Sequence, residues 1–541
     1  MMNTDSGNKI QTDIFCRRTI DGLTKWTVEW IPVFIVNMVI SAIVYSLLMC
    51  NQLVNQLDGM WHGSVSYANA HELSIGRWFW RFLDKGRLYL SPDPITSVIS
   101  LMFFSFSIIL ILDGLNVKGR FARYAASLLF MVNISVLVLL SYRYMSPTFS
   151  VSCFLAVFSA YILVKFNHPL IIFTVSPLSI ALMLGLYQAN FGCFCLFLLV
   201  YISLHLYKND MTGKDLGLFI LRAFISLIIG AILYYALLQL NLWHYNVEMA
   251  SYNGADSYDL PGIIKNLPSS FLHTYGDFSM YFKNDWIRSN VFSGKLYIIV
   301  FILLGIHFVK AACDIFKAGK LYTLLFIASL LLIPAACNAV LMIAYNSVTS
   351  IQMTIPMSLC IPILLCLASH IPTLRHPAGT AYRIALALFT GILLYGNYLM
   401  AIYDEQAMYM GTNSLRELTS QITDSLQMYN LYHPYYKYVF VGRPADSPLF
   451  AKDFVYDRAN EYARIGTWDP DDTRWVVQSW QGFFTYEMGI NLSIADDDKL
   501  EEALRDETVR NMPVFPEYGS MALLNDVVVI KLSDDYEVWE D

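Results

Sequence analysis

The chain has 541 residues, of which 56% are hydrophobic and only 15% are charged, with a mean hydropathy of +0.47. This apolar fraction is too high for an ordinary soluble domain, and it predicts a polytopic α-helical membrane protein. The formal net charge of -7 says little about partners, because the two signs are segregated by side of the membrane. We expect contact with the lipid bilayer and no nucleic-acid partner.

Apolar runs long enough to cross a bilayer recur over the first three quarters of the chain. We predict about 11 transmembrane helices, and the first apolar run stays in the protein because no small-residue cleavage site follows it. The predicted spans are Trp30–Met49, Ile95–Leu112, Ala125–Leu140, Thr148–Val164, Ile171–Leu186, Phe191–Leu206, Leu216–Leu238, Leu296–Ala312, Leu321–Ala344, Pro356–Ala368 and Ile384–Ile402.

Basic residues in the connections set the predicted orientation. They precede the first span and fill the even-numbered connections, for example at Lys118, Arg120, Lys165 and Lys214. By the positive-inside rule these connections and the N-terminus are cytoplasmic. An odd number of spans then places the C-terminus outside.

The first external loop, residues 50–94, combines a carboxylate, two histidines, three arginines and several tryptophans. We predict a short helix over 76–83 on the bilayer surface, with Arg77 and Arg81 on one face. Together with Arg87, these guanidinium groups suit a lipid phosphate, because arginine stays charged and can donate two hydrogen bonds to phosphate oxygens. Simple anchoring to anionic headgroups is the alternative.

A second long external loop is predicted at residues 241–294, and we expect a few short helices in it, with turns at Pro261-Gly262 and Pro268. A solvated cap over the bundle is as good an interpretation as a catalytic role. Its chemically active residues are Asp256, Asp259, His273, Asp277, Asp285, Trp286 and Arg288.

From residue 404 the composition changes to that of a water-soluble domain, so we predict an external α/β domain over 404–541. Helices are expected at Ser414–Met428 and Leu449–Arg464. Strands are expected at Tyr438–Gly442 and Asp526–Leu532.

Four segments together resemble the glucosyl transferase II family, the membrane glucosyltransferases linked to O-antigen modification, which belongs with the GT-C enzymes that use polyprenyl-phosphate sugars. The similar segments are Asp58 with the following aromatic residues and Gly76-Arg77, then Leu184–Ala189, then Tyr438–Gly442, and finally Met512–Ser520 followed by Asp526–Leu532.

The resemblance implies a GT-C-like fold in which residues 1–403 form the transmembrane glycosyltransferase domain. It implies transfer of glucose from a polyprenyl-phosphate donor to an envelope polysaccharide such as O-antigen, at the outer face of the bacterial cytoplasmic (inner) membrane. A carboxylate must take the acceptor proton and cations must stabilise the departing phosphate.

The resemblance also suggests which residues act. Asp58 would be the general base, Arg77 with Arg81 or Arg87 would hold the phosphate, and Tyr187 with Gln188 would form the floor of the site. Family members often have two adjacent acids where this chain has Asp58-Gly59, so Glu72 and Asp84 remain alternative bases.

No cofactor is expected besides the lipid-linked sugar, because arginines can supply the positive charge, although a divalent ion remains open. A flippase and a polyprenyl-phosphate glucosyltransferase are the expected partners. Two competing interpretations are a lipid-linked-sugar flippase or other polysaccharide transporter, and a non-catalytic glycan-binding partner. The transporter is disfavoured because ionisable residues are sparse within the spans.

Overall fold

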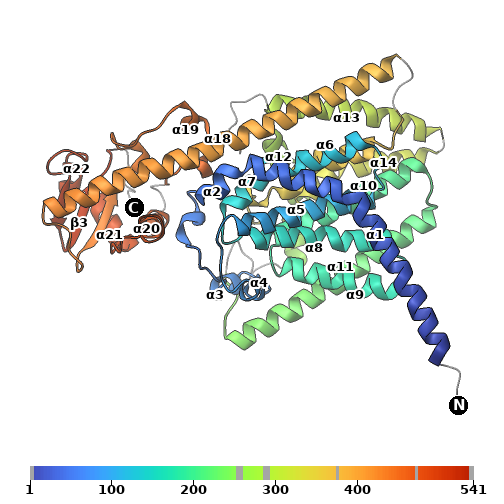
Figure 1. Cartoon of the computed structure of the whole chain (residues 1–541), viewed down its shortest axis with the longest axis horizontal. Helices are drawn as coiled ribbons and strands as arrows, with labels where there is room; N and C mark the ends of the chain where they lie inside the picture. The colour runs from blue at the N-terminus through green and yellow to red at the C-terminus, as the bar shows by residue number, and fades with distance from the viewer. Residues whose placement is uncertain are drawn as a thin grey trace.

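The computed structural model describes residues 5–250, 260–283, 293–317, 319–372, 377–468 and 473–534, without the side chains of 5–21, 23, 58, 260 and 293. A bundle of helices forms most of the molecule, and a smaller domain with a sheet lies at one end of it (Figure 1). We call this end of the bundle the domain end. The long helix α18 (Ala378–Met428) runs along the bundle and out into the smaller domain.

The remaining bundle helices are mostly apolar. They are α1 (Asp5–Val44), α2 (Ser46–Asn51), α5 (Ile95–Gly114), α6 (Arg120–Met131), α7 (Ile134–Ser141), α8 (Ser146–Lys165), α9 (Pro169–Leu184), α10 (Phe191–Lys208), α11 (Gly213–Tyr245), α12 (Leu260–Lys283), α13 (Ser293–Phe316), α14 (Lys320–Leu331), α15 (Ile333–Cys337), α16 (Ile355–Ser358) and α17 (Cys360–Ala368). Short 3₁₀ turns lie at η2 (Gln188–Asn190), η4 (Ala339–Met342) and η5 (Ile351–Met353).

The membrane class follows from these helices. Among the described residues, seven helices are long and apolar enough to cross a bilayer, and the bent pair α6 and α7 makes eight. Three further predicted spans correspond to shorter apolar helices, α9, α14 and the α16–α17 segment. The chain is therefore a membrane protein, whereas the count of 11 spans stays a prediction.

The α6–α7 break lies inside a predicted span, and the two helices bend by 40°. Asn133 accounts for it, because its side chain accepts a hydrogen bond from Ser135 N at 3.0 Å and caps α7. An amide that serves as an N-cap starts a new helix instead of continuing the old one.

The second long loop differs from the expectation of short helices. One helix of 24 residues, α12, fills 260–283 and includes both Pro261 and Pro268. Pro261 stands in the first turn, where a missing N–H costs nothing, so only Pro268 interrupts the helix interior. Asp256, Asp259, Asp285, Trp286 and Arg288 lie outside the described residues.

The small domain contains a three-stranded sheet in the order β1-β3-β2. Strand β1 (Lys437–Val441) pairs in parallel with β3 (Val527–Lys531), and β2 (Met521–Leu524) pairs with β3 in antiparallel fashion. Strands β1 and β3 overlap the two predicted strands, Tyr438–Gly442 and Asp526–Leu532, and β2 was not predicted. The helical elements are α19 (Phe454–Arg458), α20 (Thr473–Gly482), α21 (Asp497–Arg505), α22 (Glu507–Arg510), the 3₁₀ turns η6 (Pro444–Asp446) and η7 (Glu461–Ala463), and the π-helix η8 (Phe483–Met488).

Two predictions for this region differ from the structure. The helix expected over 449–464 is reduced to α19 and η7, since Ala459 and Asn460 between them are extended. The change of composition at 404 falls inside α18, which continues without a break through position 403. One helix thus belongs to the bundle and to the small domain at once.

Candidate functional site

The first loop contains three short elements: η1 (Asp58–Trp61), α3 (Ala70–Ser74) and α4 (Trp80–Gly86). Its middle is docked onto the domain end of α9. Phe79 N donates to Gly185 O at 2.8 Å, and the Tyr234 hydroxyl of α11 donates to Gly76 O at 3.2 Å. Gln188 Nε2 lies 3.4 Å from the same Tyr234 hydroxyl.

The predicted surface helix over 76–83 is shifted in the structure. Gly76 has φ +86°, which ends the preceding turn, and α4 begins only at Trp80. Arg77 therefore precedes the helix, and Arg77 and Arg81 do not share a helix face. The prediction of a shared face from the i and i+4 spacing was wrong, because Gly76 at a positive φ interrupts the helix and Arg77 lies before α4 begins.

Arg77 lies between aromatic rings. Its Cζ is 5.2 Å from the ring centroid of Tyr187 and 5.9 Å from that of Trp80, within the range of a cation–π contact. Its Nε is buried and has no hydrogen-bond partner among the described residues. The structure thus brings the predicted pair Arg77 and Tyr187 together and leaves a guanidinium N–H ready for an acceptor.

Arg81 makes a separate contact. Its Cζ lies 3.7 Å from the ring centroid of Tyr245, at the domain end of α11, and its Nη1 is buried without a described partner. Arg77 and Arg81 therefore contact aromatic rings in different parts of the fold, Tyr187 in the connection after α9 and Tyr245 at the end of α11. Both keep donors available for an anion.

Arg87 is already engaged. It donates to Asp84 Oδ1 from Nε at 3.1 Å and from Nη2 at 2.8 Å, and Nη2 also donates to Tyr144 O at 2.6 Å. Asp84 is 1% exposed and its other oxygen accepts from Ala68 N at 2.7 Å. Burial raises the pKa of Asp84, and Arg87 acts against that shift.

The alternative bases have structural partners. Asp84 holds Arg87 and the loop backbone, while Glu72 Oε2 accepts from Asn69 N at 2.6 Å in the capping box of α3. Asp58 begins η1, but its side chain lies outside the described ones. The backbone beside it is fixed, because Gly59 N donates to Asn55 Oδ1 at 3.2 Å.

Sequence reasoning missed Asp93 and Arg143, both 6% exposed. Asp93 Oδ1 accepts from Ser97 N and Oγ, and Oδ2 is buried without a described partner. Arg143 Nη2 donates to His62 O at 3.4 Å. Burial raises the pKa of Asp93, and Arg143 opposes this shift. A lone arginine in a short connection that is predicted to be external was the available signal for Arg143.

His62 lies against Tyr144 with ring centroids 3.8 Å apart. Its pKa is lowered to about 4, first by burial and then by the charge of Arg143, so the ring is neutral near pH 7. Tyr144 also stacks on Trp80 at 6.2 Å. A continuous line of contacts therefore connects Tyr187, through Arg77, Trp80 and Tyr144, to His62.

The small domain holds the beginning of this loop. Gln56 Nε2 donates to Glu461 O at 2.7 Å, and Gln56 Oε1 accepts from Thr467 N at 3.1 Å and from Thr467 Oγ1 at 2.9 Å. Trp61 Nε1 donates to Ser479 Oγ at 3.3 Å. The turn η1, which begins with Asp58, thus lies between two anchors on the small domain.

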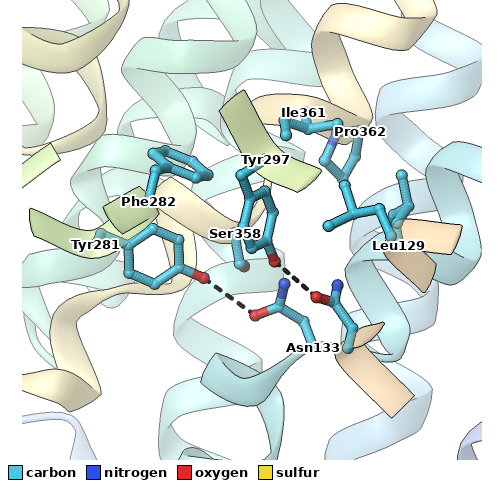
Figure 2. Close-up of a pocket in the computed structure, with 10 residues that line it drawn as sticks. Leu129, Asn133, Tyr281, Phe282, Tyr297, Ser358, Ile361 and Pro362 are labelled. Atoms are coloured by element: carbon cyan, nitrogen blue, oxygen red, sulfur yellow. Dashed lines mark hydrogen bonds between the residues drawn. The ribbon is translucent and has the colours of Figure 1, made fainter. Parts of the chain in front are cut away.

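Two other polar clusters lie apart from the loop. In α12, Asp277 is 1% exposed and accepts from Thr349 Oγ1 at 2.5 Å, with His273 Nε2 at 3.3 Å. Figure 2 shows a buried pocket in the bundle, where Tyr281 donates to Asn133 at 3.1 Å and Tyr297 donates to Asn397 at 2.8 Å. Its lining residues are Leu129, Asn133, Tyr281, Phe282, Tyr297, Ser358, Ile361, Pro362, Leu393 and Asn397, none of which is charged.

The fold and the first loop together define a polytopic membrane protein with a cation-rich site at the domain end of its bundle. A family model described as Glucosyl transferase GtrII matches residues 62–367, and the chain belongs to this family. No curated protein and no solved structure matches the chain.

Family membership makes the protein a glucosyltransferase that acts on cell-envelope glycans, with a sugar donor and a glycan acceptor as substrates. This favours the enzyme over the flippase interpretation. The matched segment contains Arg77, Arg81, Arg87, Tyr187 and Gln188, whereas Asp58 lies just before it.

Proposed function

We propose that the protein transfers glucose from a polyprenyl-phosphate donor to an envelope glycan such as O-antigen, at the outer face of the cytoplasmic membrane. The fold would be of the GT-C kind with 11 spans, a cytoplasmic N-terminus and an external small domain. The observation that carries the proposal is the position of Arg77 over Tyr187, with a buried Nε that has no hydrogen-bond partner in the described part of the chain. A lipid phosphate supplies the acceptor oxygens that this group lacks.

The reaction is a displacement at the anomeric carbon. The acceptor oxygen forms a bond to C1 of glucose while the bond from C1 to the phosphate oxygen breaks, and the polyprenyl phosphate leaves. Asp58 takes the acceptor proton as general base. Arg77 and Arg81 stabilise the charge that develops on the leaving phosphate, because their donors are fixed beforehand.

The other predicted residues have supporting roles in this proposal. Arg87 is fixed by its ion pair with Asp84, and its Nη1, which has no partner among the described residues, is left to donate to the phosphate. Tyr187 supports Arg77, and Gln188 supports the Gly76 turn through Tyr234. Guanidinium groups carry the leaving-group charge, so the proposal includes no metal ion or other cofactor.

The donor chemistry implies a supply route. A polyprenyl-phosphate glucosyltransferase makes the lipid-linked sugar on the cytoplasmic side, and a flippase brings it outward. We propose these two as functional partners.

The test is Asp58→Asn, assayed for glucose transfer in membranes with matched expression. We expect a loss of roughly 10²–10⁴-fold, the usual contribution of a positioned base. Asp93→Asn is the matched control, because Asp93 is the buried carboxylate with a free oxygen in the same loop. Near-normal transfer by Asp58→Asn would remove Asp58 from the mechanism, and a loss only in Asp93→Asn would reassign the base.

A further inference from the structure

A crevice opens at the C-terminal end of strand β1 in the small domain. The crevice is shallow: its enclosed part measures only about 20 Å³, and the rest of its space opens to solvent. Gly442 and Arg443, which follow the strand, form one side, and Trp468 forms another. Strand β1 runs parallel to β3, and the carboxyl ends of parallel strands are where open α/β sheets place ligands.

The polar side chains that line this crevice carry hydrogen-bond donors that find no acceptor among the described residues. Trp468 is 4% exposed, and its indole N–H has no hydrogen-bond partner within the described ranges. The Nε of Arg443 is likewise buried and unpartnered. The Ser533 hydroxyl does not line the crevice but is also buried without a described partner, and it lies so close to Gly442 that a side chain at 442 would clash with it. Buried donors of this kind favour an oxygen-rich ligand.

The rest of the lining is apolar. Phe440, Val476 and Leu504 complete the walls. Sugars combine hydroxyl oxygens with apolar C–H faces, so a few donors beside aromatic and aliphatic walls match a sugar residue.

The crevice is directly connected to the first loop. Thr467, which donates to Gln56, precedes Trp468 in the chain. Ser479, which accepts from Trp61, precedes Trp480, and Trp480 packs edge-on against Trp468 at 4.8 Å. The side of the domain that lines the crevice therefore also holds η1 and its Asp58.

We propose that this crevice is an acceptor subsite, which binds a sugar residue of the envelope glycan through Trp468 Nε1 and Arg443. Binding there keeps the acceptor chain beside the first loop while one of its hydroxyl groups reaches the transfer site. This inference rests on the proposed function, because the ligand is the acceptor of that reaction.

The test uses the purified full-length protein and fluorescently labelled, delipidated polysaccharide from the envelope of the cells that make this protein. We compare Trp468→Phe, which keeps an aromatic ring but removes the N–H, and Arg443→Gln with the unchanged chain. Each should bind the polysaccharide about three- to tenfold more weakly, as expected for one lost hydrogen bond. The matched controls are the exposed Trp243→Phe and Arg505→Gln.

The outcomes separate the two proposals. Full binding by a folded Trp468→Phe or Arg443→Gln, or no binding by the unchanged chain, overturns the subsite. If Trp468→Phe fails to fold, Arg443→Gln alone decides. Asp58→Asn should bind normally but not transfer, so normal transfer by Asp58→Asn with weakened binding by Trp468→Phe would overturn the mechanism and keep the subsite.

Discussion

At the scale of single residues, Arg77 and Arg87 show two ways to hold a guanidinium group. Arg87 is paired with the buried Asp84, which neutralises its charge. Arg77 is held by the rings of Tyr187 and Trp80, and it forms no ion pair with any side chain that the structure describes. A cation held by aromatic rings keeps its charge for a ligand.

The first prediction concerns Arg77. Replacement by Ala should lower glucose transfer by roughly 10²–10³-fold, as for the loss of one preorganised donor. Arg77→Lys should restore only a small part, because a lysine lacks the planar fork. Transfer rates in membranes measure both variants, with the exposed Arg383→Lys as the control. Equal rates for Arg77→Lys and the unchanged chain would contradict the phosphate role.

The second prediction is a pH dependence from His62. Unfolded, its pKa is near 6.5, whereas in the folded protein it is about 4. As pH falls from about 6.5 to 4, the unfolded chain binds a proton that the folded chain does not, so stability is lost. Over this pH range the free energy of unfolding of His62→Gln should fall less than that of the unchanged chain, and the difference should be roughly 1–3 kcal/mol.

Thermal unfolding of both proteins across this pH range measures the difference. The raised pKa values of Asp84 and Asp93 have the opposite effect on stability, since a carboxyl group with a raised pKa makes the folded protein less stable as pH rises. Both proteins share these carboxylates, so the difference between them reports His62. Parallel curves of unfolding temperature against pH would show that His62 titrates normally.

Part of the site follows from sequence, and part does not. Arginines beside aromatic residues in a loop that is predicted to be external directed attention to Arg77 and Tyr187, which the structure places in contact, while their roles remain predictions. Asp93 and Arg143 were missed, because no local pattern shows that they are buried. Asp93 is an acid just before a predicted span, and Arg143 lies in a six-residue connection. Their environment comes from tertiary packing alone.

At the scale of elements, the contact between the first loop and α9 depends on small residues. Gly185 follows α9, and a Cβ there would lie 2.7 Å from Trp78 and 3.1 Å from Phe79 Cβ. Gly76 at φ +86° turns the chain so that Arg77 reaches Tyr187. Helix periodicity could not show this turn, because a positive φ leaves the pattern of apolar residues unchanged.

The third prediction uses Gly185→Ala. The added methyl group must push Trp78 away from α9, so overpacking should cost about 1–3 kcal/mol and displace the Arg77 segment. We expect lower transfer with normal membrane insertion, measured as rate per amount of folded protein. Gly305→Ala in α13 is the matched control, because nothing lies within 4 Å of its Cβ position. Equal activity of the two variants would mean that the loop tolerates the shift.

At the scale of the whole molecule, the small domain completes the first loop. Gln56 and Thr467 are 411 positions apart in the chain, yet they hydrogen-bond directly. Trp61 reaches Ser479 over a separation of 418. Such long-range pairs have no local signature, which explains why sequence reasoning predicted two domains but not the contacts between the first loop and the small domain.

The fourth prediction tests the orientation. In a background with Cys16, Cys50 and Cys313 changed to Ser, the exposed positions Tyr67→Cys and Tyr518→Cys should react with a membrane-impermeant maleimide on intact spheroplasts. Lys214→Cys, at the opposite end of the bundle, should react only after lysis. Labelling of Lys214→Cys before lysis, with Tyr67→Cys protected, would reverse the orientation and place the site in the cytoplasm.

Helix α18 has a mechanical consequence. Its 51 residues measure about 77 Å, whereas the hydrocarbon core of a bilayer is about 30 Å thick. The helix is therefore long enough to cross the bilayer and to continue into the small domain. A thicker or thinner bilayer changes the tilt of such a helix. We expect that tilt to move the small domain, and with it the residues that anchor Gln56 and Trp61, so that the rate of sugar transfer depends on lipid chain length.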